Sequence, residues 1–419
     1  MISKEVLRRI VFQQKEQLTR IEDTTPRETL TEILKWIEDK RIIILTGIRR
    51  CGKSTILKQI IANTKNYCYV NFEGEGFIDF QAKDFELLNE ALIETYGNPK
   101  IYFFDEIQNI DKFETFIRRL QDANKKIVIT GSNASLLSKE LGTRLTGRYK
   151  PFEVFPFSFK EFLEFKKIRI SEKELYNVHN KVLMIQAFKE YLEVGGFPEY
   201  LKNKDPGYIQ TIYENILYRD IISRYNIKKQ KTIKELANIL SANISEKITY
   251  NSLKNNLTLS NAITVKEYIS YLNNAYIFFE LLKFDYSIKK QLNAPRKIYI
   301  IDPALKTIGL QISQNKEKIL ENAIFLHLRR VRKEIYYYSQ KGECDFVIRD
   351  KLKITEAIQA CYELTDKNKK REVDGLMEAM TEFKLSKGTI ITLDQEDEIK
   401  IEGKTIKIIP AWKWMTNSQ

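Results

Sequence analysis

Residues 47–54 read Gly-Ile-Arg-Arg-Cys-Gly-Lys-Ser, and this stretch constrains the fold of the chain more than any other. It fits the phosphate-binding loop pattern G-x-x-x-x-G-K-S/T without a mismatch. The apolar run 42–46 ahead of it predicts a buried strand, and residues 55–61 behind it are apolar at helical spacing. A strand, a glycine loop and a helix in this order point backbone N–H groups and a positive helix end at a triphosphate. The sequence therefore predicts an α/β nucleotide-binding core.

The predicted phosphate-binding residues form the loop and the first turn behind it: Gly47, Ile48, Arg49, Arg50, Cys51, Gly52, Lys53, Ser54 and Thr55. Lys53 is expected to reach the β- and γ-phosphates, and the Ser54 hydroxyl to bind Mg²⁺. A second metal ligand is expected at the end of another buried strand. The apolar run 101–104 delivers Asp105 to such an end, where a carboxylate holds the water shell of Mg²⁺.

Glu106 follows Asp105 directly, and the alternation of a strand predicts that it points to the other side of the pleat. Two adjacent carboxylates indicate divided roles. We expect Asp105 to bind the metal and Glu106 to orient or deprotonate an attacking water. This pair favours hydrolysis over phosphoryl transfer to a metabolite. The alternative is that Glu106 only caps or solvates a helix that begins near Ile107.

A third predicted strand, residues 126–130, is followed by Gly131, Ser132 and Asn133. Ser132 and Asn133 are candidates to sense the γ-phosphate and hold the attacking water. The alternative is an ordinary serine-rich turn.

Two arginines follow this turn at Arg144 and Arg148. Either is a candidate to neutralise charge in the transition state, in its own subunit or across an oligomer. The alternative is that both are solvated arginines on exposed loops. Their position in the sequence leaves these alternatives open.

The bulk composition excludes several classes of protein. No apolar run approaches the length of about 20 residues that spans a membrane, and the start of the chain lacks the apolar core of a signal peptide, so a cytoplasmic protein is expected. The four cysteines form no C-x-x-C pair, which argues against a disulfide framework or a zinc ribbon. Only two histidines are present, which removes most zinc hydrolases and Ser-His-Asp enzymes. The net charge of +13 favours nucleic acid as a partner, although lysine-rich solvated faces explain it equally well.

A chain of 419 residues is too long for one core, and the pattern along it predicts four parts. Residues 1–165 are predicted as the nucleotide core and residues 166–230 as a helical lid over the nucleotide. Residues 231–300 read as three short helices and a strand pair, which is the winged-helix layout. Residues 301–419, here called the tail, alternate helix and strands in the order of a restriction-endonuclease-like α/β domain.

A helix start is predicted near the amino terminus, within the sequence Thr25-Pro26-Arg27-Glu28. Thr25 is expected to cap the helix, with proline in the first turn and Glu28 closing a capping box.

Positive charge in the predicted winged helix gathers on the wing rather than on its third helix. That helix carries Lys266 as its only basic residue, whereas five cations lie on the wing: Lys283, Lys289, Lys290, Arg296 and Lys297. This distribution of charge therefore favours contact with the phosphates of duplex DNA over recognition of its bases. The alternative is a winged helix used for packing or protein contact.

The tail has two of the three acidic positions that a nuclease of its predicted fold needs. Glu321 and Asp345 occupy the first two. At the third, the chain reads Gln359-Ala360-Cys361, and neither glutamine nor cysteine supplies the required carboxylate and lysine. We expect a structural or binding remnant rather than a nuclease.

Taken together, these residues resemble the archaeal-type ATPases of the AAA superfamily that end in a restriction-endonuclease-like domain. The motifs that carry the resemblance cover nearly the whole chain: the phosphate loop with Arg49-Arg50, Phe104-Asp105-Glu106, Thr130-Gly131-Ser132, Gly147-Arg148, Phe155-Pro156-Phe157-Ser158, Gly195-Gly196-Phe197-Pro198, Tyr299-Ile300-Ile301-Asp302 and Glu343-Cys344-Asp345-Phe346. The resemblance implies ATP as the nucleotide. It implies Lys53, Ser54, Asp105 and Glu106 as the residues for ATP and Mg²⁺, with Arg148 carried over beside them.

The leading hypothesis is an Mg²⁺-dependent ATPase that couples nucleotide state to movement of its winged-helix and tail domains. Two alternatives stay open. One is a nucleotide-gated regulator that binds duplex DNA through the wing lysines and hydrolyses ATP slowly. The other is an ATP-dependent nuclease that uses Glu321 and Asp345.

Overall fold

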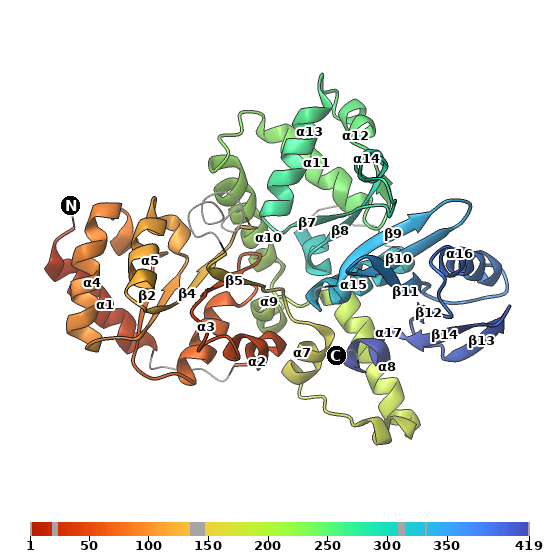
Figure 1. The fold of residues 1–419 in the computed structure, drawn as a ribbon, viewed down its shortest axis with the longest axis horizontal. Helices are drawn as coiled ribbons and strands as arrows, with labels where there is room; N and C mark the ends of the chain where they lie inside the picture. Colours follow the sequence, from red (N-terminus) through yellow and green to blue (C-terminus); the bar gives the residue numbers. More distant parts are fainter. Residues whose placement is uncertain (1, 19–23, 135–146, 309–314, 332, 418–419) are drawn as a thin grey trace. The chain divides into compact units, whose positions relative to one another are not determined.

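The computed structural model describes residues 2–18, 24–134, 147–308, 315–331 and 333–417. The chain divides into two compact units, Met1–Phe155 and Pro156–Gln419, whose elements are coloured along the sequence in Figure 1. Across the described ranges, no helix is both long enough and apolar enough to cross a bilayer. The four domain boundaries and the lid role drawn from the sequence stay predictions.

A five-stranded parallel sheet forms the centre of the first unit, in the order β2-β3-β4-β1-β5. Its strands are β1 Ile42–Thr46, β2 Tyr67–Asn71, β3 Ile101–Asp105, β4 Lys126–Gly131 and β5 Tyr149–Glu153. Burial on both faces explains the continuous apolar runs that predicted the first, third and fourth of them. The expected α/β core is confirmed. Because all strands run the same way, their carboxyl ends meet at one edge of the sheet.

Helices cover this sheet. They are α1 Lys4–Leu18, α2 Glu28–Leu34, α3 Lys53–Ala62, α4 Phe85–Tyr96 and α5 Phe113–Asp122. Alternate strand residues such as Ile44 and Phe104 pack in one core cluster with residues of α1, α4 and α5. Helices α1 and α4 lie side by side (Figure 1), joined by an ion pair between Lys4 and Glu94 at 2.9 Å.

The predicted capping box ahead of α2 is wrong. The helix begins at Glu28, and Arg27 occupies the N-cap position in an extended conformation, without a side-chain cap. The Arg27 side chain is buried and donates its hydrogen bonds elsewhere, to the carbonyls of Cys51 and Phe155. A seven-residue helix packed against α3 does not depend on the cap that the sequence suggested.

The second unit begins with helices: α7 Phe159–Phe165, α8 Val178–Val194, α9 Pro198–Asn203, α10 Pro206–Asn215 and a π-helical segment Ile216–Ser223 that continues α10. The turn between α8 and α9 is fixed by Asp302, whose carboxylate accepts hydrogen bonds of 2.8 Å from the N–H groups of Gly196 and Ala304. Gly195 has a φ of +74°, and a Cβ there would lie 1.8 Å from Oδ1 of Asp302. Only glycine fits this position.

Three helices and a small antiparallel sheet follow. They are α11 Gln230–Ala242, β6 Lys247–Ile248, α12 Tyr250–Asn256, α13 Ala262–Asn274, β7 Phe278–Leu281 and β8 Arg296–Ile300, with the strands in the order β6-β8-β7. The expected loop between the last two strands contains a short helix, α14 Ile288–Asn293, capped by the Ser287 hydroxyl. The winged-helix assignment stays a prediction.

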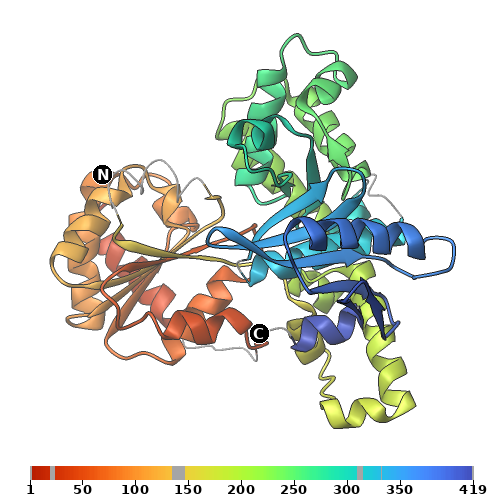
Figure 2. The ribbon, with the colours of Figure 1, turned by 45° about the vertical axis from the view of Figure 1, so that its right-hand side comes forward.

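The tail is built on a six-stranded mixed sheet in the order β13-β14-β12-β11-β10-β9. Its elements are α15 Lys316–Arg330, β9 Glu334–Ser339, β10 Glu343–Asp350, β11 Lys353–Ala360, α16 Lys369–Glu382, β12 Lys387–Thr392, β13 Asp397–Ile401, β14 Lys404–Pro410 and α17 Ala411–Asn417. Figure 2 shows α16 along one face of this sheet. Leu376 and Met380 of α16 belong to the same core cluster as Ile390 of β12. The nuclease-like assignment stays a prediction.

Candidate active site

The predicted phosphate loop joins the carboxyl end of β1 to the amino end of α3. Gly52, the N-cap residue of α3, is left-handed with a φ of +102°, and Arg50 also has a positive φ, of +66°. Alternation of right- and left-handed residues turns successive backbone N–H groups into one concave surface that attracts anions. The positive end of the α3 dipole adds to this attraction. The loop geometry therefore suits phosphate.

Lys53 lies at the centre of this surface and is only 3% exposed. Its Nζ donates to the carbonyl oxygens of Gly47 (3.2 Å) and Ile48 (3.3 Å), and it lies 3.4 Å from Oε1 of Glu106. Burial on its own lowers the pKa of Lys53, but the neighbouring carboxylates, Glu106 foremost, outweigh it, and the pKa lies above its ordinary value. Lys53 is therefore a buried ammonium held next to a carboxylate.

Asp105 ends β3 and is fully buried. Its carboxylate accepts hydrogen bonds from the hydroxyls of Thr130, Tyr69 (3.3 Å) and Ser54. Burial raises the pKa of Asp105, with a further contribution from the charge of Glu106, while the hydroxyl donors oppose the shift. A serine hydroxyl next to a carboxylate is the oxygen donor pair that suits Mg²⁺ when phosphate oxygens and water complete the shell. Ser54 and Asp105 therefore fit the metal that the sequence predicts.

Glu106 does not point away from Asp105, so the orientation that the strand pleat predicted is wrong. The strand ends at Asp105, and Glu106 adopts a left-handed conformation with a φ of +52°. This turn directs its carboxylate toward Lys53 and the amide of Gln108, while its N–H donates to Oγ1 of Thr130 at 2.9 Å. A left-handed residue other than glycine costs about 1 kcal/mol or more, and such strain gathers at functional sites.

The alternative role for Glu106, capping or solvating a helix, does not match its surroundings. A short 3-10 helix, Ile107–Asn109, does follow, but the Glu106 side chain makes no cap bond to it and the residue is only 8% exposed. Burial acts to raise the pKa of Glu106, but the ammonium of Lys53, the amide of Gln108 and the charge of Arg49 together hold that pKa below its ordinary value. Glu106 is thus a buried, ionised carboxylate.

Ser132 and Asn133, the sensor candidates, are both buried directly after β4. Oγ of Ser132 lies 3.5 Å from Nε2 of Gln108, the same amide that donates to Glu106. Sequence reasoning missed Gln108 and Thr130. Thr130 was detectable, because it is a polar residue at the end of a buried apolar run. Gln108 carried no such signal, since its role depends on the turn at Glu106.

Arg148 lies at the amino-terminal ends of the strands, whereas the phosphate loop lies at their carboxyl ends. It is therefore too far away to act on phosphates in its own subunit, and this part of its predicted role is wrong. Its carbonyl accepts from the N–H of Ile42 at the start of β1, and its side chain pairs with Asp122 at 3.0 Å. The loop follows Thr46 at the other end of that strand, roughly 15 Å away at the usual rise per residue. A role across an oligomer stays a prediction. Arg144 lies outside the described residues.

The remaining loop residues surround this centre. Nη1 of Arg49 donates to Oε1 of Glu73 at 2.8 Å, and the Arg50 side chain is exposed. Ile48 and Cys51 are fully buried, and Thr55 in the first turn of α3 is half-buried. Burial raises the pKa of the Cys51 thiol, which is one of four free, buried cysteines.

The tail holds a second charged cluster, made of Glu321 on α15 and Glu343 and Asp345 on β10, here called the tail carboxylates. The ammonium of Lys297 on β8 lies among them, with Nζ at 2.9 Å from Glu321, 2.8 Å from Glu343 and 2.8 Å from Asp345. Lys297 is 2% exposed, so the prediction that it contributes to DNA contact on the wing is wrong. The guanidinium of Arg296, the neighbouring residue on the wing, also has an internal contact, because it stacks over the Tyr250 ring.

A divalent cation does not fit the tail carboxylates. The space between Glu321 and Asp345 already holds the Lys297 ammonium. At the third position the amide of Gln359 accepts from the N–H of Asp345 (3.2 Å) and donates to Glu372 (2.7 Å). Within the described part of the chain, no three His, Cys, Asp or Glu residues are grouped so as to hold a metal. The cluster lines a cavity of about 650 Å³ but lacks the ligands of a metal centre.

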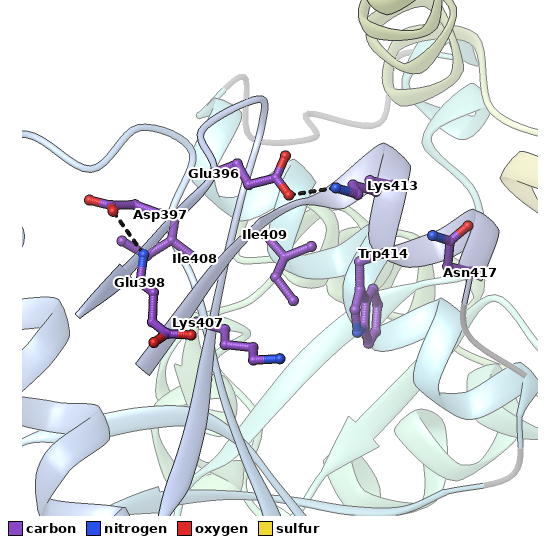
Figure 3. Close-up of a pocket in the computed structure, with 9 residues that line it drawn as sticks. All are labelled: Glu396, Asp397, Glu398, Lys407, Ile408, Ile409, Lys413, Trp414 and Asn417. Carbon is purple, nitrogen blue, oxygen red and sulfur yellow. Dashed lines mark hydrogen bonds and ion pairs between the residues drawn. The ribbon is translucent and has the colours of Figure 1, made fainter. Parts of the chain in front are cut away.

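Another hollow, of about 540 Å³, lies between β13, β14 and α17 (Figure 3). Glu396 forms an ion pair with Lys413 at its rim, and Trp414 of α17 forms part of its wall. None of the residues singled out by the sequence lines it.

Comparison with known proteins gives two kinds of match. Residues 39–163 match the family described as an AAA domain, and residues 185–316 match a domain of unknown function (DUF8612). The uncharacterized protein MJ1544 of Methanocaldococcus jannaschii is 37% identical over 403 residues, covering 91% of this chain and 89% of the relative. An uncharacterized protein of Haemophilus influenzae is 29% identical, covering 91% of this chain and 96% of the relative.

Two solved structures show more distant likeness. The Walker-type ATPase PABY2304 of Pyrococcus abyssi is 18% identical with a TM-score of 0.45, over 69% of this chain and 97% of that one. The Orc1 protein of Aeropyrum pernix in complex with DNA is 10% identical with a TM-score of 0.30, over 74% and 97% of the two chains. Both scores lie below 0.5, so neither structure informs the chemistry of this chain.

Proposed function

This chain belongs to the same family as MJ1544 of M. jannaschii, and its residues 39–163 match an AAA domain. We propose that it is a P-loop ATPase that hydrolyses ATP with Mg²⁺ and couples the nucleotide state to movement of the domains that follow. The observation that carries this proposal is the buried pair of Lys53 and Glu106, 3.4 Å apart, beside the bonded pair of Ser54 and Asp105. An ammonium, a hydroxyl and two carboxylates thus lie at the edge of the sheet where the loop opens.

Lys53 and the loop bind the triphosphate. The ammonium donates hydrogen bonds to the carbonyls of Gly47 and Ile48. When ATP binds, it exchanges these bonds for the more negative β- and γ-phosphate oxygens. Ser54 and Asp105 would hold Mg²⁺, which when bound neutralises phosphate charge and polarises the transferred group. Thr130 fixes the Asp105 carboxylate for this task.

Glu106 acts as the base. While it faces Lys53 it stays ionised, and when the ammonium turns to the phosphates the carboxylate is free to accept a proton. The oxygen of a water then bonds to the γ-phosphorus, the bond from that phosphorus to the bridging oxygen of ADP breaks, and the water proton passes to Glu106. The products are ADP and inorganic phosphate. Gln108, which contacts both Glu106 and Ser132, positions the base.

The proposal is tested by phosphate release and nucleotide binding for three proteins: wild type, Lys53→Ala and Glu106→Gln. We expect Lys53→Ala to lose nucleotide binding. Glu106→Gln should bind ATP as wild type does but lose turnover about 10²- to 10⁴-fold, the usual contribution of a general base. A Glu106→Gln protein with wild-type turnover would refute the assignment of the base. Wild type without Mg²⁺-dependent phosphate release would refute the ATPase itself.

The domains that respond to the nucleotide are proposed to be a winged helix and a nuclease-like tail. The order of α11, α12 and α13 before the β7–β8 hairpin supports the first. The sequence of α15, three antiparallel strands, α16 and a parallel strand supports the second. The Lys297 ammonium among the tail carboxylates and the Gln359 amide argue against cleavage, so nuclease activity is not proposed.

A second candidate function, binding of duplex DNA, is favoured by the exposed Lys289 and Lys290 on α14. Lys297 and Arg296 are occupied, so phosphate contact through this hairpin depends on these two lysines and the half-buried Lys283. The affinity for DNA should then fall with salt by a slope that corresponds to two or three phosphate contacts. Binding that is absent, or unchanged in a Lys289→Ala, Lys290→Ala double variant, would exclude this function.

A further inference from the structure

We propose that Arg27 is a positioning residue of the nucleotide site: its guanidinium sets the orientation of the Cys51–Gly52 peptide in the phosphate loop and ties that loop to Phe155. This inference rests on the proposed ATPase function and extends it. No motif in the sequence assigns a role to Arg27, which lies outside the loop, at the start of α2.

Arg27 is a buried cation between two carbonyls. The residue is 5% exposed, with Nη1 donating to the carbonyl oxygen of Cys51 at 2.8 Å and Nη2 to that of Phe155 at 2.6 Å. A guanidinium stays charged at every accessible pH, and burying a charge is costly unless it is hydrogen-bonded. These two carbonyls are therefore held firmly in place.

The bond to Cys51 decides where the next N–H points. In a trans peptide the C=O and the following N–H point in opposite directions. Since Arg27 holds the Cys51 carbonyl on its own side of the loop, the N–H of Gly52 is directed to the opposite side, at the amino end of α3. Turning this peptide over would remove a partner from the guanidinium and take one donor away from the phosphates.

Gly52 leaves room for the guanidinium of Arg27. A Cβ at Gly52 would lie 2.7 Å from Nη1 of Arg27, so the glycine leaves the space that the guanidinium fills, in addition to adopting a φ of +102°. The second glycine of the phosphate-loop pattern and Arg27 thus form one unit, although 25 positions separate them in the sequence.

The other end of the loop contacts the same segment that Arg27 reaches. The N–H of Val154 donates to the carbonyl of Thr46 at 2.6 Å, and a Cβ at Gly47 would lie 2.0 Å from the Val154 carbonyl oxygen. Phe155 is the last residue of the first compact unit. Arg27 therefore ties the phosphate loop to the residue after which the second unit begins.

The test compares Arg27→Gln and Arg27→Lys with wild type, and with Arg41→Gln as a matched control. Arg41 is a half-buried arginine of the same unit that bonds Asp39 at 2.8 Å and lies at the opposite edge of the sheet from the loop. Three quantities are measured for each protein: the Kd for a fluorescent ATP analogue, KM and kcat for phosphate release, and the melting temperature.

We expect Arg27→Gln to raise the Kd and KM for ATP at least tenfold, and Arg41→Gln to leave both unchanged. Arg27→Lys keeps the charge but cannot bond two carbonyls in a fixed fork, so it should restore the melting temperature more fully than the affinity. A merely structural arginine would lower the melting temperature without this separation. Wild-type Kd and KM in folded Arg27→Lys protein would overturn the inference, even where Arg27→Gln does not fold.

Failure of the inference and failure of the proposed function give different results. If the chain is no ATPase, wild type itself lacks ATP binding and phosphate release, and Lys53→Ala behaves like wild type. If only the role of Arg27 is wrong, wild type binds and hydrolyses ATP, Lys53→Ala does not, and the Arg27 variants match wild type.

Discussion

Nζ of Lys297 lies 2.8 Å from Oδ1 of Asp345, so a lysine of the β7–β8 hairpin neutralises a carboxylate of the tail sheet. Both residues are buried, and Glu321 and Glu343 complete the surroundings of the ammonium. The site that the sequence suggested as a remnant of metal chemistry is therefore an internal ion cluster that joins two elements of the second unit.

Replacing Lys297 by methionine should destabilise the protein by about 3–5 kcal/mol, because it leaves buried carboxylates without a counter-charge. Burial and the charge of Asp345 already raise the pKa of Glu321 to about 8, and the loss of Lys297 removes the main group that opposes them, leaving the Tyr299 hydroxyl. Urea unfolding measures the change, with exposed Lys289→Met as the control. A decrease in the unfolding free energy of less than about 1 kcal/mol would show that the ion cluster contributes little to stability.

Replacing Gly195 by alanine should be severely destabilising, by more than about 3 kcal/mol, because the new methyl group would overlap the Asp302 carboxylate. Gly403 is a matched control with the same φ of +74° and no atom within 4 Å of the added Cβ. Gly403→Ala should lower the free energy of unfolding by about 1 kcal/mol, because only the strain of alanine at a positive φ opposes it. Equal losses in the two variants, measured by thermal unfolding, would contradict the contact with Asp302.

Replacing Thr130 by valine should lower kcat for ATP hydrolysis about tenfold with little change in ATP affinity, since the hydroxyl fixes Asp105 and accepts from the N–H of Glu106. Steady-state phosphate release gives both quantities. Thr95→Val is the control, because that hydroxyl donates to the carbonyl of Ala91 in its own helix. Unchanged kcat in Thr130→Val would remove Thr130 from the site.

Stability should fall in mild acid through His327. Burial, with the charge of Arg330 adding to it, lowers the pKa of His327 to about 3 in the folded protein. In the unfolded chain the pKa is about 6.5, so between these pH values the unfolded state binds a proton that the folded state does not. The stability that a neutral His327 contributes is thus present above pH 6.5 and lost as the pH falls toward 3.

Between pH 7 and pH 5 this loss amounts to about 2 kcal/mol. Other groups titrate in the same window, so the quantity to measure is the difference in unfolding free energy between wild type and His327→Leu at each pH. That difference should shift by this amount in favour of the variant as the pH falls. A difference that is independent of pH would show that His327 titrates normally.

The sequence predicted the nucleotide core well because its signals are local. An apolar run, a glycine loop and a helix follow one another directly, and the match to the AAA domain together with the parallel sheet confirms this core. Asp105 was placed correctly at the end of its strand for the same reason. The roles of the individual site residues stay predictions.

Other predictions failed where a contact depends on distant parts of the chain. The pleat rule does not apply to Glu106, because the strand ends one residue earlier. Charge in the sequence does not reveal that Lys297 is buried among three carboxylates. Arg148 follows a loop motif, yet the parallel register of β5 carries it to the far edge of the sheet. Arg27 was interpreted only as part of a helix start.

The left-handed backbone at Glu106 has a consequence for how this sequence is maintained. Glycine would adopt the same φ of +52° with less strain, and asparagine would tolerate it better than glutamate does. Either replacement would relieve strain in the backbone but would remove the carboxylate that lies 3.4 Å from Nζ of Lys53. Thermodynamic stability and the proposed role of Glu106 as a base therefore favour different residues at this position.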